Sequence, residues 1–172
     1  MQHFNTLNFE HQGNTENDLH LQSTEEVGEA IINLSASALR SIKIFTPDLE
    51  HTLYDTNIFR ESLLNFARGN RHAQVQVLVS DISFSVQRGH RLLRLAQQLT
   101  TAMKIKITPE DYLDTNISFI QVDQTGFIFK KDSTKPHAIY SNCKNRSNKL
   151  LEFFTPAWEQ AEQAPQSQQI HI

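Results

Sequence analysis

Two β-rich runs joined by a short turn constrain the fold of this chain more than any other feature. Residues 116–123 read Asn-Ile-Ser-Phe-Ile-Gln-Val-Asp, and residues 127–130 read Phe-Ile-Phe-Lys. Between them, the segment from Asp123 to Gly126 has the D-x-x-G pattern of a tight hairpin. The sequence therefore predicts two adjacent antiparallel strands, with the first at the centre of a sheet.

The elements before this hairpin alternate between strand and helix patterns. Ser23, with Glu26 three residues later, predicts a capping box at the start of the first helix. The expected strands cover residues 19–22, 41–46, 73–79, 103–107, 116–123, 127–129 and 137–140, and the expected helices cover residues 23–39, 57–68, 81–99 and 145–158. This alternation predicts an α/β fold with a mixed, largely parallel sheet flanked by helices on both faces. We expect Pro156 to bend or restart the last helix.

The composition predicts one domain with polar ends. A chain of 172 residues with a mean hydropathy of −0.46 is long enough for one hydrophobic core. We expect a flexible polar arm over residues 1–18, the domain over 19–162 and a disordered tail over 163–172. No run approaches the roughly 20 apolar residues that cross a membrane, and no secretory signal follows Met1, so we expect a cytoplasmic protein. The single cysteine, Cys143, excludes an intramolecular disulfide.

The order of elements and three local patterns resemble one repeat of the phospholipase D superfamily. The patterns are Arg88-Gly89-His90, the strand end Val122-Asp123-x-x-Gly126 and the aromatic helix from Leu150 to Trp158. The resemblance covers roughly residues 20–160. Within the superfamily, the chain looks most like a small bacterial family of unknown function that lacks the catalytic His and Lys. Active members with one repeat per chain pair two motifs across a dimer axis, so the resemblance implies a homodimer.

The superfamily motif is H-x-K-x-x-x-x-D, in which the His attacks phosphorus, the Lys neutralises phosphate charge and the Asp orients its surroundings. In that register Asn116 stands in place of the His and Ser118 in place of the Lys, while Asp123 matches. An amide is a very poor nucleophile and a serine hydroxyl carries no charge. The resemblance therefore implies a non-catalytic binding or interaction module, whose partner is a protein or an anionic ligand.

A second group of residues forms a candidate anion pocket. Arg88 and His90 are expected near a sheet edge, with Asp81 as an orienting acid and with Asn142 and Arg146 pointing into the same pocket. A buried, hydrogen-bonded histidine is the structural alternative. If His90 instead replaces the missing nucleophile, the chain is a divergent phosphodiesterase.

Residues 60–106 carry the one marked charge asymmetry. The net charge of the chain is −3, yet this region holds eight bases against Glu61 and Asp81. The candidate basic surface comprises Arg68, Arg71, Arg91, Arg94, Lys104 and Lys106. Because Arg88, Arg91 and Arg94 are spaced by three, one helix would align them as a stripe. The stripe is either a solvated helix face or a surface for nucleic acid, an acidic partner or anionic lipid.

Metal and nucleotide signatures are absent from the sequence. It holds no H-E-x-x-H pattern, no C-x-x-C pair and no EF-hand loop. It also lacks a Walker A loop, a G-x-G-x-x-G turn and a G-x-S-x-G elbow. We therefore predict no metal and no cofactor.

Overall fold

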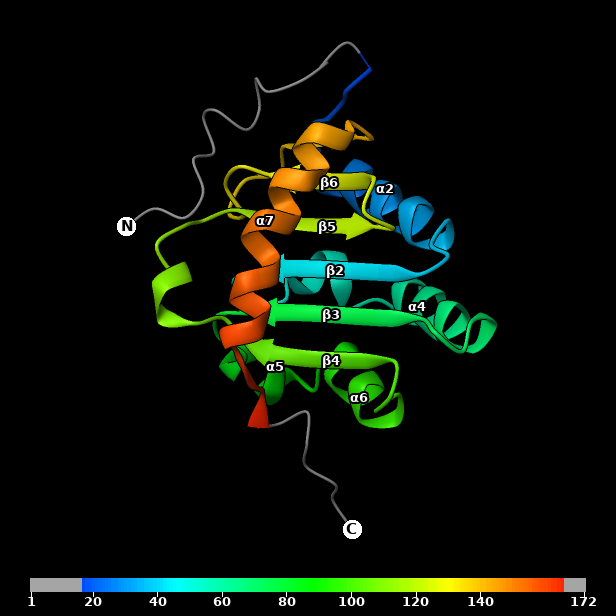
Figure 1. Cartoon of the computed structure of the whole chain (residues 1–172), viewed down its shortest axis with the longest axis vertical. Coiled ribbons are helices and arrows are strands. Elements are labelled where there is room, and N and C mark those ends of the chain that lie inside the picture. The colour runs from blue at the N-terminus through cyan, green and yellow to red at the C-terminus, as the bar shows by residue number, and fades with distance from the viewer. Residues whose placement is uncertain (1–16, 166–172) are drawn as a thin grey trace.

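The computed structural model describes residues 17–165, which form an α/β domain around one mixed sheet (Figure 1). The strands are β1 (Leu19–Leu21), β2 (Ser41–Thr46), β3 (Gln74–Val79), β4 (Met103–Ile107), β5 (Ser118–Val122), β6 (Gly126–Lys130), β7 (Ala138–Ser141) and β8 (Glu162–Gln163), in the spatial order β1-β7-β6-β5-β2-β3-β4-β8. The predicted mixed sheet is confirmed. Parallel pairing, however, is limited to β2, β3 and β4. Strand β5 pairs antiparallel with β2, and hairpins then join β5, β6 and β7 in antiparallel order.

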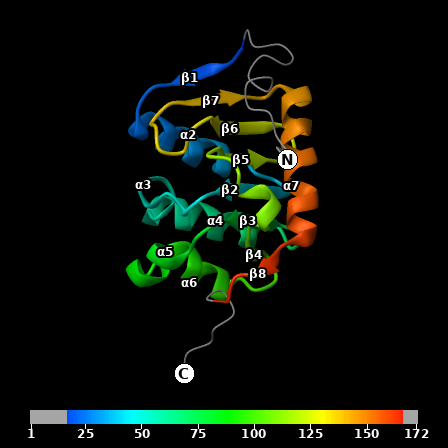
Figure 2. The same cartoon turned by 90° about the vertical axis from the view of Figure 1, so that its left-hand side faces the viewer.

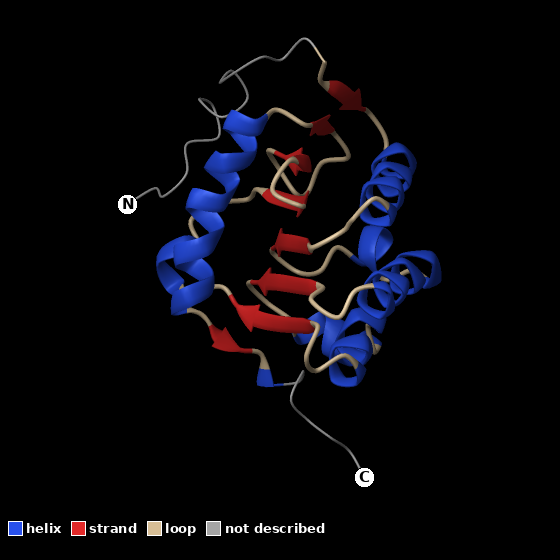
Figure 3. Ribbon diagram, turned by 45° about the vertical axis from the view of Figure 1, so that its right-hand side comes forward, coloured by secondary structure: helices blue, strands red, loops and turns tan. Residues whose placement is uncertain are grey.

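Helices cover both faces of the sheet, as predicted (Figures 2 and 3). They are α2 (Thr24–Ala36), α3 (His51–Tyr54), α4 (Asn57–Gly69), α5 (Ser83–Arg88), α6 (Arg91–Gln98) and α7 (Lys144–Gln160), with a short 3-10 helix at Glu110–Tyr112. Helix α7 lies on one face, and α2 to α6 lie on the other. Ser23 caps α2 as predicted, since its Oγ accepts a hydrogen bond from the Glu26 amide at 3.2 Å. The Glu26 carboxylate in turn accepts the amide of Gln22, at 2.7 Å, in place of the Ser23 amide that a capping box would use.

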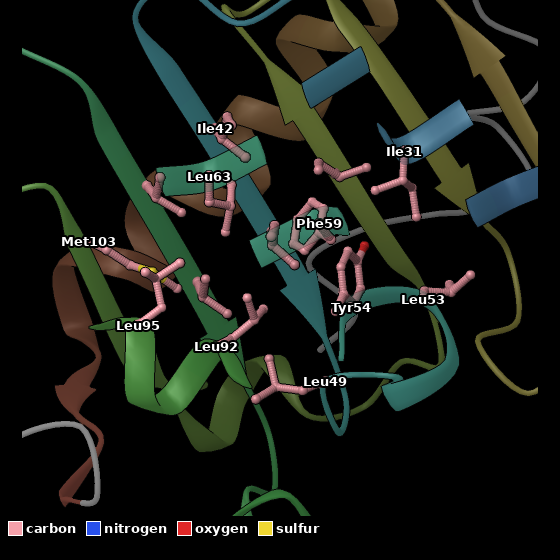
Figure 4. Packing of buried hydrophobic residues seen from close by; sticks show 14 of the residues in the cluster. Ile31, Ile42, Leu49, Leu53, Tyr54, Phe59, Leu63, Leu92, Leu95 and Met103 are labelled. Carbon is pink, nitrogen blue, oxygen red and sulfur yellow. The ribbon is translucent and has the colours of Figure 1, made fainter. Parts of the chain in front are cut away.

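Side-chain alternation along the central strands builds two cores. Val75, Val77 and Val79 of β3 face α2 to α6 and belong to the larger core, part of which is drawn in Figure 4. Leu78 points to the opposite face and packs in the aromatic core that contains Phe153 of α7. Fully burying each such side chain stabilises the fold by about 1.5–3 kcal/mol.

The helix predicted over residues 81–99 is two helices, which corrects the sequence analysis. Gly89 adopts the left-handed conformation, with φ 71°, and the His90 amide donates to the Ser85 carbonyl at 2.9 Å. This geometry ends α5, and α6 begins at Arg91. Arg88 therefore lies on a different helix from Arg91 and Arg94.

Smaller differences concern element ends. Helix α2 ends at Ala36 rather than near Leu39, because the backbone and side chain of Ser37 both donate to the Leu34 carbonyl. The sequence does not predict α3, since four residues are too few for a helical period. Helix α7 continues through Pro156 and does not restart there.

The described ends of the chain are bound to the domain. Asp18, the last residue of the predicted arm, forms a buried ion pair with Arg146. Residues 162–163 pair with β4 as β8, and the Ala164 amide donates to the Ile105 carbonyl at 2.9 Å. The first residues of the predicted tail are therefore part of the sheet. The rest of the arm and tail, residues 1–16 and 166–172, lies outside the described residues.

Asp123 joins the predicted hairpin to the connection between α2 and β2. Its carboxylate accepts hydrogen bonds from the amides of Leu39 at 2.8 Å, Arg40 at 2.7 Å and Ser41 at 3.0 Å. Asp123 and Gln124 both have positive φ, at 53° and 66°, as a tight hairpin turn requires. The aspartate thus stabilises the end of α2 and the start of β2 together.

Replacing Asp123 with alanine is expected to lower the free energy of unfolding by about 2 kcal/mol, because three amides lose a charged acceptor. Urea denaturation measures the change. Gln124→Ala alters the same turn without removing these bonds and is expected to change stability by less than about 0.5 kcal/mol. Equal effects of the two substitutions would contradict the assigned role of the aspartate.

Candidate functional site

The candidate site lies where the parallel strands β2 and β3 end. In α/β sheets, ligands bind beyond the carboxyl ends of such strands. Thr46 is the last residue of β2, and antiparallel pairing brings the first residue of β5, Ser118, and the last residue of β6, Lys130, to the same edge. Strand alternation places these three side chains on the face that α2 covers.

A buried ion pair occupies this edge. Glu50, from the loop after β2, lies with Oε1 2.9 Å from Lys130 Nζ, and their side chains are only 8% and 10% exposed. Thr46 Oγ1 donates to Glu50 Oε2 at 3.2 Å, and the Ser118 hydroxyl also hydrogen-bonds the carboxylate. The Lys130 ammonium donates in addition to the Ser133 carbonyl at 3.1 Å. Burial raises the pKa of Glu50, and its attraction to Lys130 offsets part of that rise.

A strained turn presents Glu50 to the site. Leu49 and Glu50 have φ values of 63° and 20°, which residues other than glycine rarely adopt and which cost roughly 1–3 kcal/mol each. The Leu49 amide donates to Thr46 Oγ1 at 3.2 Å, and the Leu49 side chain is buried in the larger core (Figure 4). The surrounding fold therefore holds the turn in this conformation.

His90 contacts the same turn at Leu49. His90 Nε2 lies 3.1 Å from the Leu49 carbonyl oxygen, and Nδ1 accepts a hydrogen bond from the Leu92 amide at 3.1 Å. This pattern assigns the proton to Nε2 and makes the imidazole neutral. Burial lowers the pKa of His90 accordingly. The fully buried side chain is thus the cap of α6 and an anchor of the Glu50 turn.

Asp55, which follows α3, binds the arginines that border this region. Its carboxylate, 5% exposed, lies 3.3 Å from Arg88 Nε and 3.1 Å from Arg91 Nη1. Burial opposes ionisation of Asp55, but hydrogen bonds from the Arg91 amide and from the guanidinium groups of Arg91 and Arg88 lower its pKa overall. Both guanidinium groups are therefore paired within the chain.

A pocket of about 360 Å³ opens beside the ion pair. Its walls come from the start of α2, from residues 48–53 and from residues 130–136. The charged residues in this lining are Asp48, Glu50, Lys130 and Lys135, and His51 lies among them. Outside the lining, the ring of exposed Phe84 stacks obliquely with His51, with 5.8 Å between the ring centroids.

The five residues of the predicted anion pocket do not converge. Arg88 pairs with Asp55 and His90 contacts the Leu49 carbonyl, but Asp81 is exposed and its carboxylate accepts the Ser83 amide at 2.8 Å. Arg146 is buried in the first turn of α7, on the opposite face of the sheet, where it also contacts Ser141. Asn142 is exposed next to that helix. The predicted pocket therefore separates into two groups.

The three motif positions also occupy different surroundings. Asn116 is exposed and precedes β5, and its carbonyl accepts the Ser133 amide at 2.8 Å. Ser118 lies buried beside Glu50, whereas Asp123 is at the far end of β5. Of the three, Ser118 alone belongs to the candidate site.

The predicted basic residues are distributed over several sides of the described domain. Arg68 and Arg71 follow one another at the end of α4 and in the next turn, while Arg94 is exposed beside Gly89. Lys104 and Lys106 project toward the α7 face, and Lys106 Nζ lies 4.3 Å from the Trp158 ring centroid. The arginine stripe expected on a single helix is not formed, because Gly89 separates its members.

Sequence reasoning missed Glu50 and Lys130, the central pair of the site. They are 80 positions apart, and each sits in a segment with another obvious role. Lys130 ends an apolar strand, and Glu50 follows the Pro47-Asp48 stop signal. The sequence did contain one signal for the site, because Lys130 is a charged residue at the end of an otherwise apolar strand.

The family of the chain follows from a comparison with family models. The model described as Domain of unknown function (DUF7931) matches residues 23–170. This chain belongs to that family. The match includes every element that forms the candidate site of this DUF7931 domain. A comparison with curated proteins gives no match.

Solved structures with similar folds include members of the phospholipase D family. Nuc from Salmonella typhimurium, a phospholipase D family member, has a TM-score of 0.60 at 12% identity, covering 86% of this chain and 97% of Nuc. NucT from Helicobacter pylori has a TM-score of 0.60 at 10% identity, covering 86% and 99%. TrmBL2, an archaeal chromatin protein, has a TM-score of 0.63 at 10% identity, and this chain spans 87% of its own length but only 55% of TrmBL2. These likenesses establish a phospholipase D-like fold for the DUF7931 domain.

Over residues 17–165, no helix is long and apolar enough to cross a membrane. Within the same residues, no three His, Cys, Asp or Glu side chains are grouped in a way that could hold a metal ion.

Proposed function

We propose that this DUF7931 domain is a non-catalytic binding module and that its ligand site is the pocket beside Glu50 and Lys130. The buried ion pair carries this proposal. In a phosphodiesterase the lysine charge must face the phosphate, whereas here Lys130 is 2.9 Å from a carboxylate. A phosphodiester at this edge would meet Glu50, and no imidazole stands at position 116 to attack it.

The surroundings of His90 count against the alternative of a divergent phosphodiesterase. Both ring nitrogens have backbone partners, and the side chain is fully buried. A nucleophilic nitrogen needs a free lone pair at the reacting phosphorus. The dispersed basic residues likewise give little support to a nucleic-acid binder, although the similar fold of TrmBL2 belongs to a protein described as binding DNA. A cytoplasmic homodimer stays a prediction, and sedimentation equilibrium would measure the mass of the assembly.

The test is hydrolysis of an activated aryl phosphodiester, bis(p-nitrophenyl) phosphate, followed by p-nitrophenolate absorbance. We expect the rate to equal that of the buffer at every protein concentration. His90→Asn and His72→Asn form a matched pair, because His90 is buried and His72 is exposed. Turnover that rises with protein concentration, persists in His72→Asn and disappears in a folded His90→Asn would overturn the proposal in favour of a phosphodiesterase.

A further inference from the structure

The charges around the pocket beside Glu50 and Lys130 are balanced, and this balance limits what the pocket can bind. Its lining contains two acids, Asp48 and Glu50, and two bases, Lys130 and Lys135. With His51 counted as neutral, the formal charge of the lining is zero. A simple anion that approaches Lys130 also approaches Glu50, so its attraction and repulsion largely cancel. A simple cation that approaches Glu50 also approaches Lys130, so its attraction and repulsion largely cancel as well.

Both members of the buried pair retain hydrogen-bonding capacity. The Lys130 ammonium has three N–H donors, and its bonds to Glu50 and Ser133 use two of them. The Glu50 carboxylate has about four acceptor positions, of which Lys130, Thr46 and Ser118 occupy three. A ligand can therefore add a donor to Glu50 and an acceptor to Lys130 without breaking the ion pair.

We infer that this pocket binds a small zwitterion, whose ammonium group contacts Glu50 and whose carboxylate or phosphate contacts Lys130. The four charges then alternate in sign, so each has an opposite neighbour and the buried edge stays neutral. The hydroxyl groups of Thr24, Thr52 and Thr134 in the lining offer uncharged hydrogen bonds. A volume of about 360 Å³ suits a molecule between an amino acid and a lipid headgroup in size. This inference rests on the proposed ligand site and names its ligand class.

Isothermal titration calorimetry of the full chain with three matched probes tests the inference. β-Alanine carries both charges, propionate carries only the acid and propylamine carries only the ammonium group. We expect β-alanine to bind at least ten times more tightly than either single-charge probe. Inorganic phosphate is titrated as well. If propionate or phosphate binds as tightly as β-alanine, the pocket is a simple anion site and the inference is overturned.

Variants locate the binding. Because removing one charge alone leaves the other buried, the pair is removed together in Glu50→Leu/Lys130→Met, which is expected to fold and to lose β-alanine binding at least tenfold. The matched control is Lys149→Met/Glu152→Leu, which removes an exposed ion pair of 3.4 Å on α7 and should leave binding unchanged. Binding that survives in the folded Glu50/Lys130 double variant would place the ligand elsewhere.

A further comparison distinguishes a free zwitterion from a lipid headgroup as the ligand. Soluble glycerophosphoethanolamine is titrated in the calorimeter, and the protein is floated with phosphatidylcholine vesicles that contain or lack phosphatidylethanolamine. Choline ammonium has no N–H donor for Glu50, so only the ethanolamine vesicles should bind if a headgroup is the ligand. Binding of the soluble probes alone identifies a free zwitterion. If no probe binds and phosphodiester turnover is also absent, the zwitterion inference fails while the proposed binding module stands.

Discussion

Replacing Lys130 with methionine is expected to lower the free energy of unfolding by about 3–5 kcal/mol. The substitution leaves the Glu50 carboxylate almost fully buried without its cation. Thr46 and Ser118 still donate hydrogen bonds, but hydroxyl groups do not neutralise the charge. The pKa of Glu50, which burial already raises, should rise further in this variant.

The double variant Glu50→Leu/Lys130→Met is expected to recover most of that loss, because an apolar pair of similar volume avoids the desolvation cost of both charges. Urea denaturation of the wild type, both single variants and the double variant gives the coupling free energy. Lys149→Met supplies the matched control, since its exposed partner Glu152 makes a pair worth less than about 1 kcal/mol. If the double variant loses the sum of the two single effects, the charges are not coupled and the described pair is incorrect.

His90→Ala is expected to destabilise the domain by about 3–4 kcal/mol, because it creates a cavity and leaves the Leu49 carbonyl and the Leu92 amide without partners. His90→Asn should cost about half as much. Asparagine is a good helix cap for the Leu92 amide but is too short to reach the carbonyl. Urea denaturation of the three proteins measures this order. Equal losses in the two variants would show that the cap on the Leu92 amide contributes nothing measurable to stability.

The same histidine predicts a dependence of stability on pH. Burial lowers the pKa of His90, so the unfolded chain takes up a proton first as pH falls below the ordinary histidine value of 6.5. Stability should therefore decrease from about pH 6.5 downward, and His90→Asn should remove this part of the decrease. Asp55, 4.0 Å from Nδ1, resists the shift, whereas His51 and Arg88 add to it.

Glu50 acts in the opposite direction. Because its pKa is raised, the folded chain holds a proton above pH 4.5 that the unfolded chain has lost. Its contribution to stability is complete below about pH 4.5 and is lost as pH rises through the folded pKa. The pH titration is therefore repeated with Glu50→Gln, alone and combined with His90→Asn. Without Glu50, the net decrease in stability as pH falls below about 6.5 should be steeper, provided that His90 is present.

The candidate site lies at one edge of the sheet in this phospholipase D-like fold. The edge includes Ser118, and it holds a carboxylate and an ammonium group in mutual contact. A charge-neutral, partly buried edge favours ligands that are themselves neutral overall. A strained turn at Leu49 and Glu50 persists there because the core and His90 hold it.

Much of the fold could be predicted because its signals are local. The alternation in residues 74–79 and the helix cap at Ser23 each lie within a few positions of one another, so the residues themselves determine strand or helix. The hairpin at Asp123 followed from its turn residues in the same way. Gly89 shows the limit of such reasoning. A glycine can adopt a left-handed φ and end a helix there, as Gly89 does. The apolar residues on both sides of Gly89 have helical spacing, however, and this spacing favoured one continuous helix.

The sequence by itself determined the α/β class and the positions of most strands and helices. Only the tertiary structure decided that Glu50 contacts Lys130, that Asp55 pairs with both Arg88 and Arg91, and that Arg146 lies on the other face. The physical reason is the range of the interactions. Periodicity and caps act over one or two turns of chain, whereas these ion pairs join segments that come together only when the sheet order and the helix layers are complete.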